Sequence, residues 1–160
     1  MTGSIIKYSL FVCALLLNLS GFAQSQKAID DNLIKDYLAK NNIIAKKTAS
    51  GLYYTIIKKG TGKMARFGKK VSVNYLGKFL DGTKFDANVD DNFNAINPLT
   101  FTLGVGKVIR GWDEGIQLLT VGSRATFYIP SALAYGEKSV GPVPPNSVLV
   151  FDVELVSQDK

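Results

Sequence analysis

The sequence contains no histidine, and it has a single cysteine, Cys13. Serine and cysteine nucleophiles are usually activated by a histidine base, and zinc sites are built mainly from cysteine and histidine. These absences argue against a hydrolase with such a nucleophile and against a zinc enzyme. We therefore expect a functional site without a metal and without a cofactor.

Residues 1–23 have the pattern of a secretory signal peptide. Lys7 supplies the positive start, an apolar stretch covers 9–19, and Gly21-Phe-Ala23 forms a small-x-small cleavage signal before Gln24. The apolar stretch is short for a membrane span, which disfavours the alternative interpretation, an uncleaved anchor. We expect an exported protein, periplasmic or secreted, with no stable membrane insertion after cleavage. Because Cys13 leaves with the peptide, the mature chain has no disulfide.

Residues 24–160 suffice for one domain with a hydrophobic core. The formal net charge of the whole chain is +6, and basic residues gather at Lys58, Lys59, Lys63, Arg66, Lys69 and Lys70. This stretch lacks the series of aromatic side chains on which bases stack, so nucleic-acid binding is not expected. A solvated loop is the ordinary interpretation, and contact with an acidic partner or a membrane surface is the alternative.

Two segments resemble ligand-binding loops only in part. Asp90-Asp-Asn92-Phe-Asn94 begins like a calcium loop, but Ala95 replaces the required glycine and Phe101 stands where the bidentate glutamate belongs. Gly60-Thr-Gly-Lys63 lacks the full spacing of a phosphate loop. We interpret the first as a polar loop and the second as a turn.

Apolar residues at helical spacing between Ile29 and Asn42 predict a short helix near the N-terminus. Its length makes an obligate coiled coil unfavourable, so it either docks on the domain or tethers it, and pairing with another chain is the alternative. Strands are predicted by alternating or β-branched segments at 52–57, 71–79, 99–103, 125–129 and 149–155.

A short helix is predicted after Gly111, and it contains Trp112, the only tryptophan. Four or five strands with one such helix indicate an α+β domain, in which an antiparallel curved β-sheet wraps around one short α-helix. Ile109, Trp112, Ile116 and Leu119 recur at helical spacing, which is typical of ordinary core packing. Trp112 is also suited to the floor of an apolar pocket, because many aromatic residues in the strands can face the same centre.

Several short motifs occur together in a specific order and spacing. They are Val73-Asn-Tyr-Leu-Gly77, Asp81-Gly-Thr-Lys-Phe-Asp86, Leu103-Gly104, Val108-Ile-Arg-Gly-Trp-Asp-Glu-Gly115, Val121-Gly-Ser-Arg124, Ala134-Tyr-Gly136, Pro144-Pro145 and Leu149-Val-Phe-Asp-Val-Glu-Leu155. From about Ser50 to Val156 the chain therefore resembles the FKBP-type peptidyl-prolyl cis-trans isomerases. The expected organisation is a signal peptide at 1–23, a helix and linker at 24–49, and an isomerase domain at 50–160.

The resemblance implies a pocket with three catalytic residues, Asp86, Tyr135 and Trp112. Trp112 would form the floor under the substrate proline, Tyr135 would donate a hydrogen bond to a substrate carbonyl, and Asp86 would be a buried polar group held by Tyr75. The substrate-binding residues implied are Tyr75, Phe85, Leu99, Val108, Ile109, Val143 and Phe151, with Val143 at the rim.

The implied activity is rotation about X-Pro bonds in proline-containing polypeptides, by a monomer that assists the folding of exported proteins. The resemblance also implies a possible macrolide ligand such as FK506 or rapamycin. Three departures concern substrate preference: Leu99 stands where many relatives carry an aromatic wall, the 136–144 loop has no aromatic residue or histidine, and the 87–97 loop is longer than in the smallest relatives. The alternative function is a binding module that uses the same pocket without catalysis.

Overall fold

The computed structural model describes residues 24–159, so the predicted signal peptide lies outside the described residues. The elements in chain order are α1 (Gln26–Lys40), β1 (Lys46–Lys47), β2 (Tyr53–Lys58), β3 (Lys70–Lys78), β4 (Lys84–Ala87), β5 (Leu99–Thr102), α2 (Arg110–Ile116), β6 (Arg124–Ile129), the 3₁₀ turn η1 (Ser131–Leu133) and β7 (Leu149–Gln158). No helix within 24–159 is long and apolar enough to cross a membrane.

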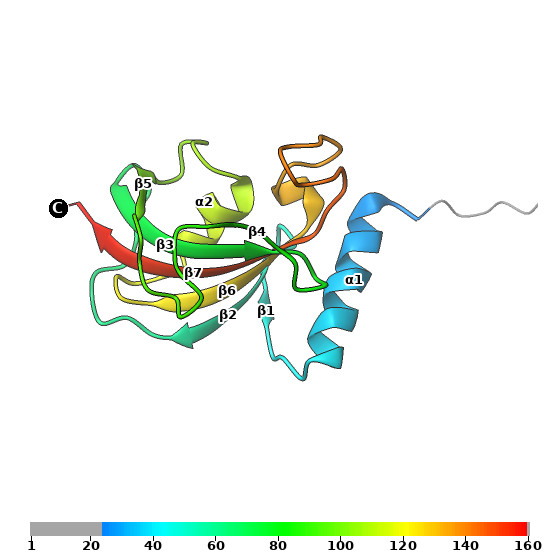
Figure 1. Cartoon of the computed structure of the whole chain (residues 1–160), viewed down its shortest axis with the longest axis horizontal. Helices are drawn as coiled ribbons and strands as arrows, with labels where there is room; N and C mark the ends of the chain where they lie inside the picture. The colour runs from blue at the N-terminus through cyan, green and yellow to red at the C-terminus, as the bar shows by residue number, and fades with distance from the viewer. Residues whose placement is uncertain (1–23, 160) are drawn as a thin grey trace, which may run out of the picture.

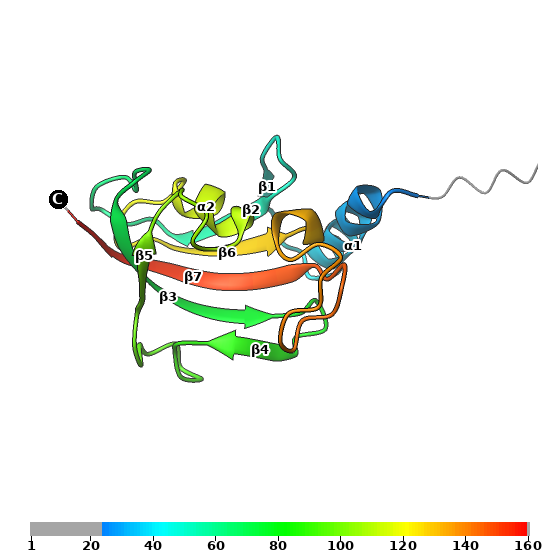
Figure 2. The same ribbon diagram turned by 90° about the horizontal axis from the view of Figure 1, so that it is seen from above.

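The described strands form one antiparallel sheet of seven strands in the order β1-β2-β6-β7-β3-β4, with β5 also paired to β3 (Figures 1 and 2). Strands β5 and β4 occupy successive parts of the same edge of β3, opposite Lys70–Val73 and Leu76–Lys78 respectively. The segment between them, 88–98, leaves this edge as a long loop. Register shifts at Ser72/Val73 and Gly77/Lys78 indicate bulges, which bend a strand.

The predicted fold class is confirmed, but the expected number of strands was too low. Strand β1 has two residues and β4 has four, and segments this short do not show the alternation on which sequence prediction relies.

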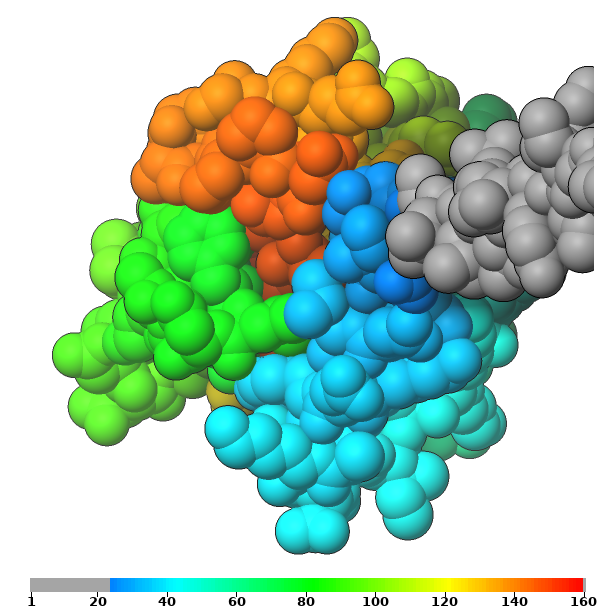
Figure 3. Space-filling view, turned by 90° about the vertical axis from the view of Figure 1, so that its right-hand side faces the viewer, coloured from blue at the N-terminus to red at the C-terminus, as the bar shows by residue number. Residues whose placement is uncertain are grey.

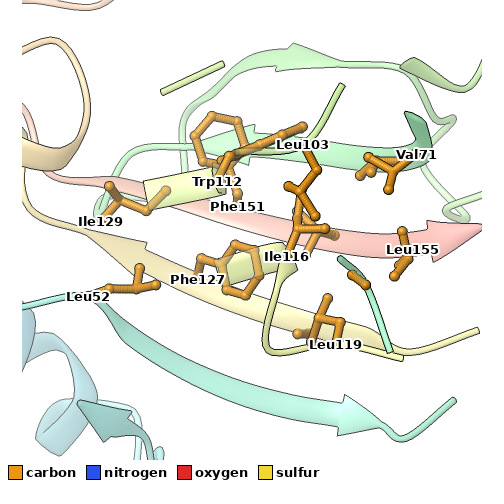
Figure 4. Packing of buried hydrophobic residues seen from close by; sticks show 14 of the residues in the cluster. Leu52, Val71, Leu103, Trp112, Ile116, Leu119, Phe127, Ile129, Phe151 and Leu155 are labelled. Carbon is orange, nitrogen blue, oxygen red and sulfur yellow. The ribbon is translucent and has the colours of Figure 1, made fainter. Parts of the chain in front are cut away.

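The main core lies between the concave face of the sheet and α2 (Figure 4). Ile116 and Phe127 are completely buried there. Helix α2 comes close to the sheet at Gly115, where a Cβ atom would lie 2.8 Å from the ring of Phe127. This close approach places Trp112, one turn earlier, against the strands that surround it.

Helix α1 docks on the face of the sheet opposite to α2, as two successive residues of β6 show. Phe127 faces α2, whereas Tyr128 packs with Ile34 and Leu38 of α1, as expected for adjacent residues of a strand. The helix begins earlier than predicted because Ser25 caps it, accepting a hydrogen bond from the amide of Ala28. Figure 3 shows α1 lying against the segment that precedes β7.

A buried carboxylate anchors α1 to the domain. Asp30 is completely buried, and its Oδ2 accepts hydrogen bonds from the amide of Ser131 at 2.7 Å and from its hydroxyl at 2.6 Å. Gln26 donates a third bond, 2.7 Å long, to Oδ1. The helix is thereby fixed to η1, the turn that leads to Tyr135.

Candidate active site

A small cavity of about 180 Å³ opens between α2, the edge of the sheet and the segment that follows η1. The two flanking segments, α2 and the chain between β6 and β7, lie on the same side of the sheet (Figure 1). The cavity is lined by Tyr75, Asp86, Leu99, Lys107, Val108, Ile109, Trp112, Tyr135 and Phe151. These include eight of the ten residues predicted for the pocket. Lys107 has no signal in the sequence that distinguishes it from other exposed lysines.

Trp112 and its neighbouring rings make the base of the cavity apolar. The indole is 3% exposed, and it meets the rings of Tyr75 and Phe151 nearly edge-on, with centroids 5.0 and 5.2 Å away and interplanar angles of 79° and 84°. Phe101 lies 6.1 Å away. The four rings come from α2, β3, β7 and β5, so the sheet and the helix together fix the shape of this base.

The Nε1 atom of Trp112 is buried and has no hydrogen-bond acceptor within residues 24–159. An unsatisfied buried donor costs about 1–3 kcal/mol, and such groups are rare in native proteins. Trp112 therefore carries a donor whose desolvation the rest of the described chain does not offset.

Phe85 and Val143, both predicted to contact substrate, do not line the cavity. The ring of Phe85 packs behind the wall, with centroids 4.9 Å from Phe79 and 5.5 Å from Phe151. It occupies the space over Gly77, where a Cβ atom would lie only 2.8 Å from this ring. Val143 is 3% exposed and belongs to the main core, so it packs inside the domain rather than at the rim of the cavity.

The polar rim of the cavity contains a tyrosine–carboxylate pair. The hydroxyl of Tyr75 donates a 2.7 Å hydrogen bond to Oδ2 of Asp86, as predicted. Asp86 itself is exposed rather than buried, which corrects the expectation from sequence. It stands on β4, a short strand at the edge of the sheet, where water reaches the carboxylate.

Tyr135 supplies the second hydroxyl at the rim. This hydroxyl makes no hydrogen bond within the described chain, so it is available to a ligand. Burial raises the pKa of Tyr135, and the negative charge of Asp86 raises it further. Burial also raises the pKa of Tyr75 well above its usual range, with the hydrogen bond to Asp86 as the second cause. Both phenols therefore remain neutral donors in alkaline solution.

Two other features, one from the sequence and one from the structure, lie apart from this cavity. The calcium-like loop closes on itself, because Asp90 accepts hydrogen bonds from the amides of Asn92 and Asn94, and residues 24–159 contain no cluster of three potential metal ligands. A larger hollow of about 430 Å³ lies between α1, β1 and η1, and none of the predicted site residues lines it. The aromatic cavity is thus the candidate site.

Solved structures define the class of protein to which this fold and cavity belong. The structure matches that of FkpA from Escherichia coli with a TM-score of 0.70 and 36% sequence identity, covering 83% of this chain and 61% of that chain. It matches AtFKBP13 with a TM-score of 0.66 and 35% identity, covering 72% and 99% respectively. The fold is therefore FKBP-like.

A family model for the FKBP-type peptidyl-prolyl cis-trans isomerases matches residues 61–156, and the chain belongs to this family. It is 48% identical over 128 residues to the FKBP-type peptidyl-prolyl cis-trans isomerase FkpA of Aeromonas hydrophila, covering 79% of this chain and 46% of that protein. It is 51% identical over 90 residues to the peptidyl-prolyl cis-trans isomerase Fkbp12 of Drosophila melanogaster, covering 56% and 80%. The chain spans about half the length of the FkpA relatives that it matches.

Proposed function

We propose that this chain is a peptidyl-prolyl cis-trans isomerase that accelerates rotation about X-Pro bonds in exported polypeptides. The observation that carries the proposal is the aromatic cavity with Trp112 at its base and the hydroxyl of Tyr135 at its rim. Membership of the FKBP-type family supports the same activity.

The cavity suits this reaction because rotation makes and breaks no covalent bond. The uncatalysed barrier is about 18–20 kcal/mol, and rotation takes roughly tens to hundreds of seconds. In the transition state the amide is twisted and its carbonyl oxygen carries less negative charge. An apolar cavity disfavours the planar amide more than the twisted one, so it lowers the barrier without an acid, a base or a metal. An acceleration of about a millionfold requires roughly 8 kcal/mol of differential stabilisation.

Each part of the cavity has a role in this mechanism. The base formed by Trp112 and Phe151 holds the apolar proline ring, with Val108 and Ile109 as further apolar walls. Tyr135 donates a hydrogen bond to a substrate carbonyl and thereby orients the chain. Asp86, fixed by Tyr75, places a negative charge beside the reacting amide.

Replacing Asp86 with alanine is expected to lower kcat/KM by about tenfold, since the loss of one charge-assisted contact costs roughly 1.4 kcal/mol. Stability is expected to change little because the side chain is exposed. The measurement is the cis-to-trans relaxation of a Leu-Pro peptide, beside unfolding in urea. Asp91→Ala, which removes the same charge from an exposed carboxylate outside the cavity, is the control. Equal activity in both variants would remove Asp86 from the mechanism.

Any decline of catalysis in alkaline solution is expected to have its midpoint above pH 10. An ordinary tyrosine has a pKa of about 10 and would be half ionised there. Because the pKa values of Tyr75 and Tyr135 are raised, the neutral hydroxyls that donate hydrogen bonds persist to higher pH. The measurement is the catalysed relaxation rate against pH, with circular dichroism recorded at each pH to follow the fold. A decline with a midpoint near pH 10 in intact protein would contradict these roles.

The proposal includes the setting in which the chain works. Residues 1–23 serve as a signal peptide, 24–49 as the docked helix and its linker, and 50–160 as the isomerase domain of a periplasmic or secreted monomer. The charge and apolar pattern of 1–23 supports export, and so does the absence of cysteine from 24–160. The docking of Ile34 and Leu38 on the chain's own sheet supports a monomer.

The second candidate function is a binding module that holds proline-containing segments or macrolides such as FK506 and rapamycin without catalysis. Leu99, which is 40% exposed, favours it, because this side chain leaves one wall of the cavity open. Several relatives, among them one of Neisseria meningitidis, carry the name FK506-binding protein. Peptide binding to a folded protein that gives no acceleration would identify this function.

A further inference from the structure

A second hollow adjoins the candidate active site. It measures about 520 Å³ and is lined by Tyr75, Ala87, Asn88, Ile96, Asn97, Pro98, Leu99 and Thr100. Tyr75 and Leu99 line both hollows, so the two hollows adjoin and share the wall that these side chains form. Half of its lining residues belong to the long loop that separates β4 from β5.

Hydrogen bonds to Asn88 hold this loop in a defined shape. Its side-chain oxygen accepts a 2.6 Å bond from the amide of Tyr75, and its side-chain nitrogen donates to the carbonyls of Val73 and Asn97 at 2.9 and 3.1 Å. The amide of Ile96 donates to the carbonyl of Asn88 at 2.9 Å, which closes the loop. A binding surface that is ordered before the ligand arrives loses less conformational entropy on binding.

The loop presents apolar side chains to solvent at this place. Ile96 is 72% exposed and Leu99 is 40% exposed, with Pro98 between them in the same hollow. Exposed apolar side chains grouped on a concave surface mark sites that bind another apolar group. Most of Ile96 is therefore open to solvent.

We propose that this hollow, the loop subsite, binds an apolar side chain of the substrate polypeptide at the second position before or after its proline. The occupant follows from the adjacency of the two hollows: a chain whose proline rests on Trp112 reaches the loop subsite if it leaves the cavity over the wall formed by Tyr75 and Leu99. An extended chain advances about 3.3–3.6 Å per residue, so one or two residues span a shared wall. The proposal rests on the proposed function and adds a preference for substrates with an apolar residue at the second position before or after the proline.

The test compares proline peptides that carry leucine or serine at the second position before or after the proline. Binding is followed by the fluorescence of Trp112, the only tryptophan in the chain. The parent is expected to bind the leucine peptide about tenfold more tightly at one of the two positions, the lower end of the effect of an apolar group in a pocket. Ile96→Ser is expected to reduce this ratio to about one.

Ile44→Ser is the matched control, because Ile44 is 91% exposed and lies outside both hollows. This variant is expected to keep the parent's ratio. Equal binding of leucine and serine peptides by the parent, or an unchanged ratio in Ile96→Ser, would overturn the loop subsite and leave the isomerase proposal intact. Failure of the parent to bind any of the peptides, together with no acceleration of X-Pro rotation, would overturn the proposed function and the loop subsite with it.

Discussion

Trp112→Ala is expected to reduce kcat/KM for X-Pro rotation by about a hundredfold, which corresponds to roughly 2.7 kcal/mol of lost contact with the proline ring. It is also expected to lower the free energy of unfolding by about 3–5 kcal/mol, because the indole is buried among three other rings. Peptide relaxation kinetics and urea unfolding measure the two effects separately.

The variant Trp112→Phe separates the role of Trp112 as the floor of the pocket from its role in packing the core. Phenylalanine retains an apolar ring at the base of the cavity and leaves a smaller void, so we expect most of the stability to remain and activity to fall by less than about tenfold. A folded alanine variant with activity within about twofold of the parent would show that Trp112 only packs the core. A phenylalanine variant that keeps its stability but loses its activity completely would contradict the account in another way, because apolar contact with the proline ring would then not explain the role of Trp112.

Asp30→Ala is expected to lower the free energy of unfolding by about 3 kcal/mol. The change removes the acceptor for the amide and the hydroxyl of Ser131, both at hydrogen-bond distance in a completely buried position. Hydrogen bonds to a charged group contribute about 1.5–3 kcal/mol each, and a buried donor left unpaired costs its desolvation. Urea unfolding of the variant and the parent measures the difference.

Asp36→Ala is the control for this change, since Asp36 lies on the same helix and is exposed. It is expected to change stability by less than about 0.5 kcal/mol. If Asp30→Ala destabilises no more than Asp36→Ala, the buried carboxylate does not anchor α1, and the apolar contacts of Ile34 and Leu38 alone hold the helix.

The sequence predicted the aromatic base of the cavity well because its signals are strong and local. Trp112 is unique, and Tyr75 and Phe151 lie in alternating segments whose apolar faces can be assigned. The structure brings these residues together from separate elements. The position of α1 against Tyr128 required tertiary information, because nothing in a strand with apolar residues on both faces tells which element covers each face.

Other details depend on contacts that a linear pattern does not contain. Asp86 is exposed because β4 is an edge strand of the sheet. The position of a strand at the edge follows from the topology of the sheet rather than from the composition of the strand. Phe85 packs behind the wall of the cavity because Gly77 leaves space for its ring. Asp30 looks like an ordinary polar residue in a helix, and only its pairing with Ser131, 101 residues away, explains its burial.

The most direct test of the account is the cis-to-trans relaxation of a short Leu-Pro peptide in the presence of residues 24–160. The account predicts a rate that rises in proportion to protein concentration well above the uncatalysed rate. A folded protein, verified by circular dichroism, that leaves the relaxation rate at its uncatalysed value would contradict the account, and the cavity over Trp112 would then be a binding site without isomerase activity.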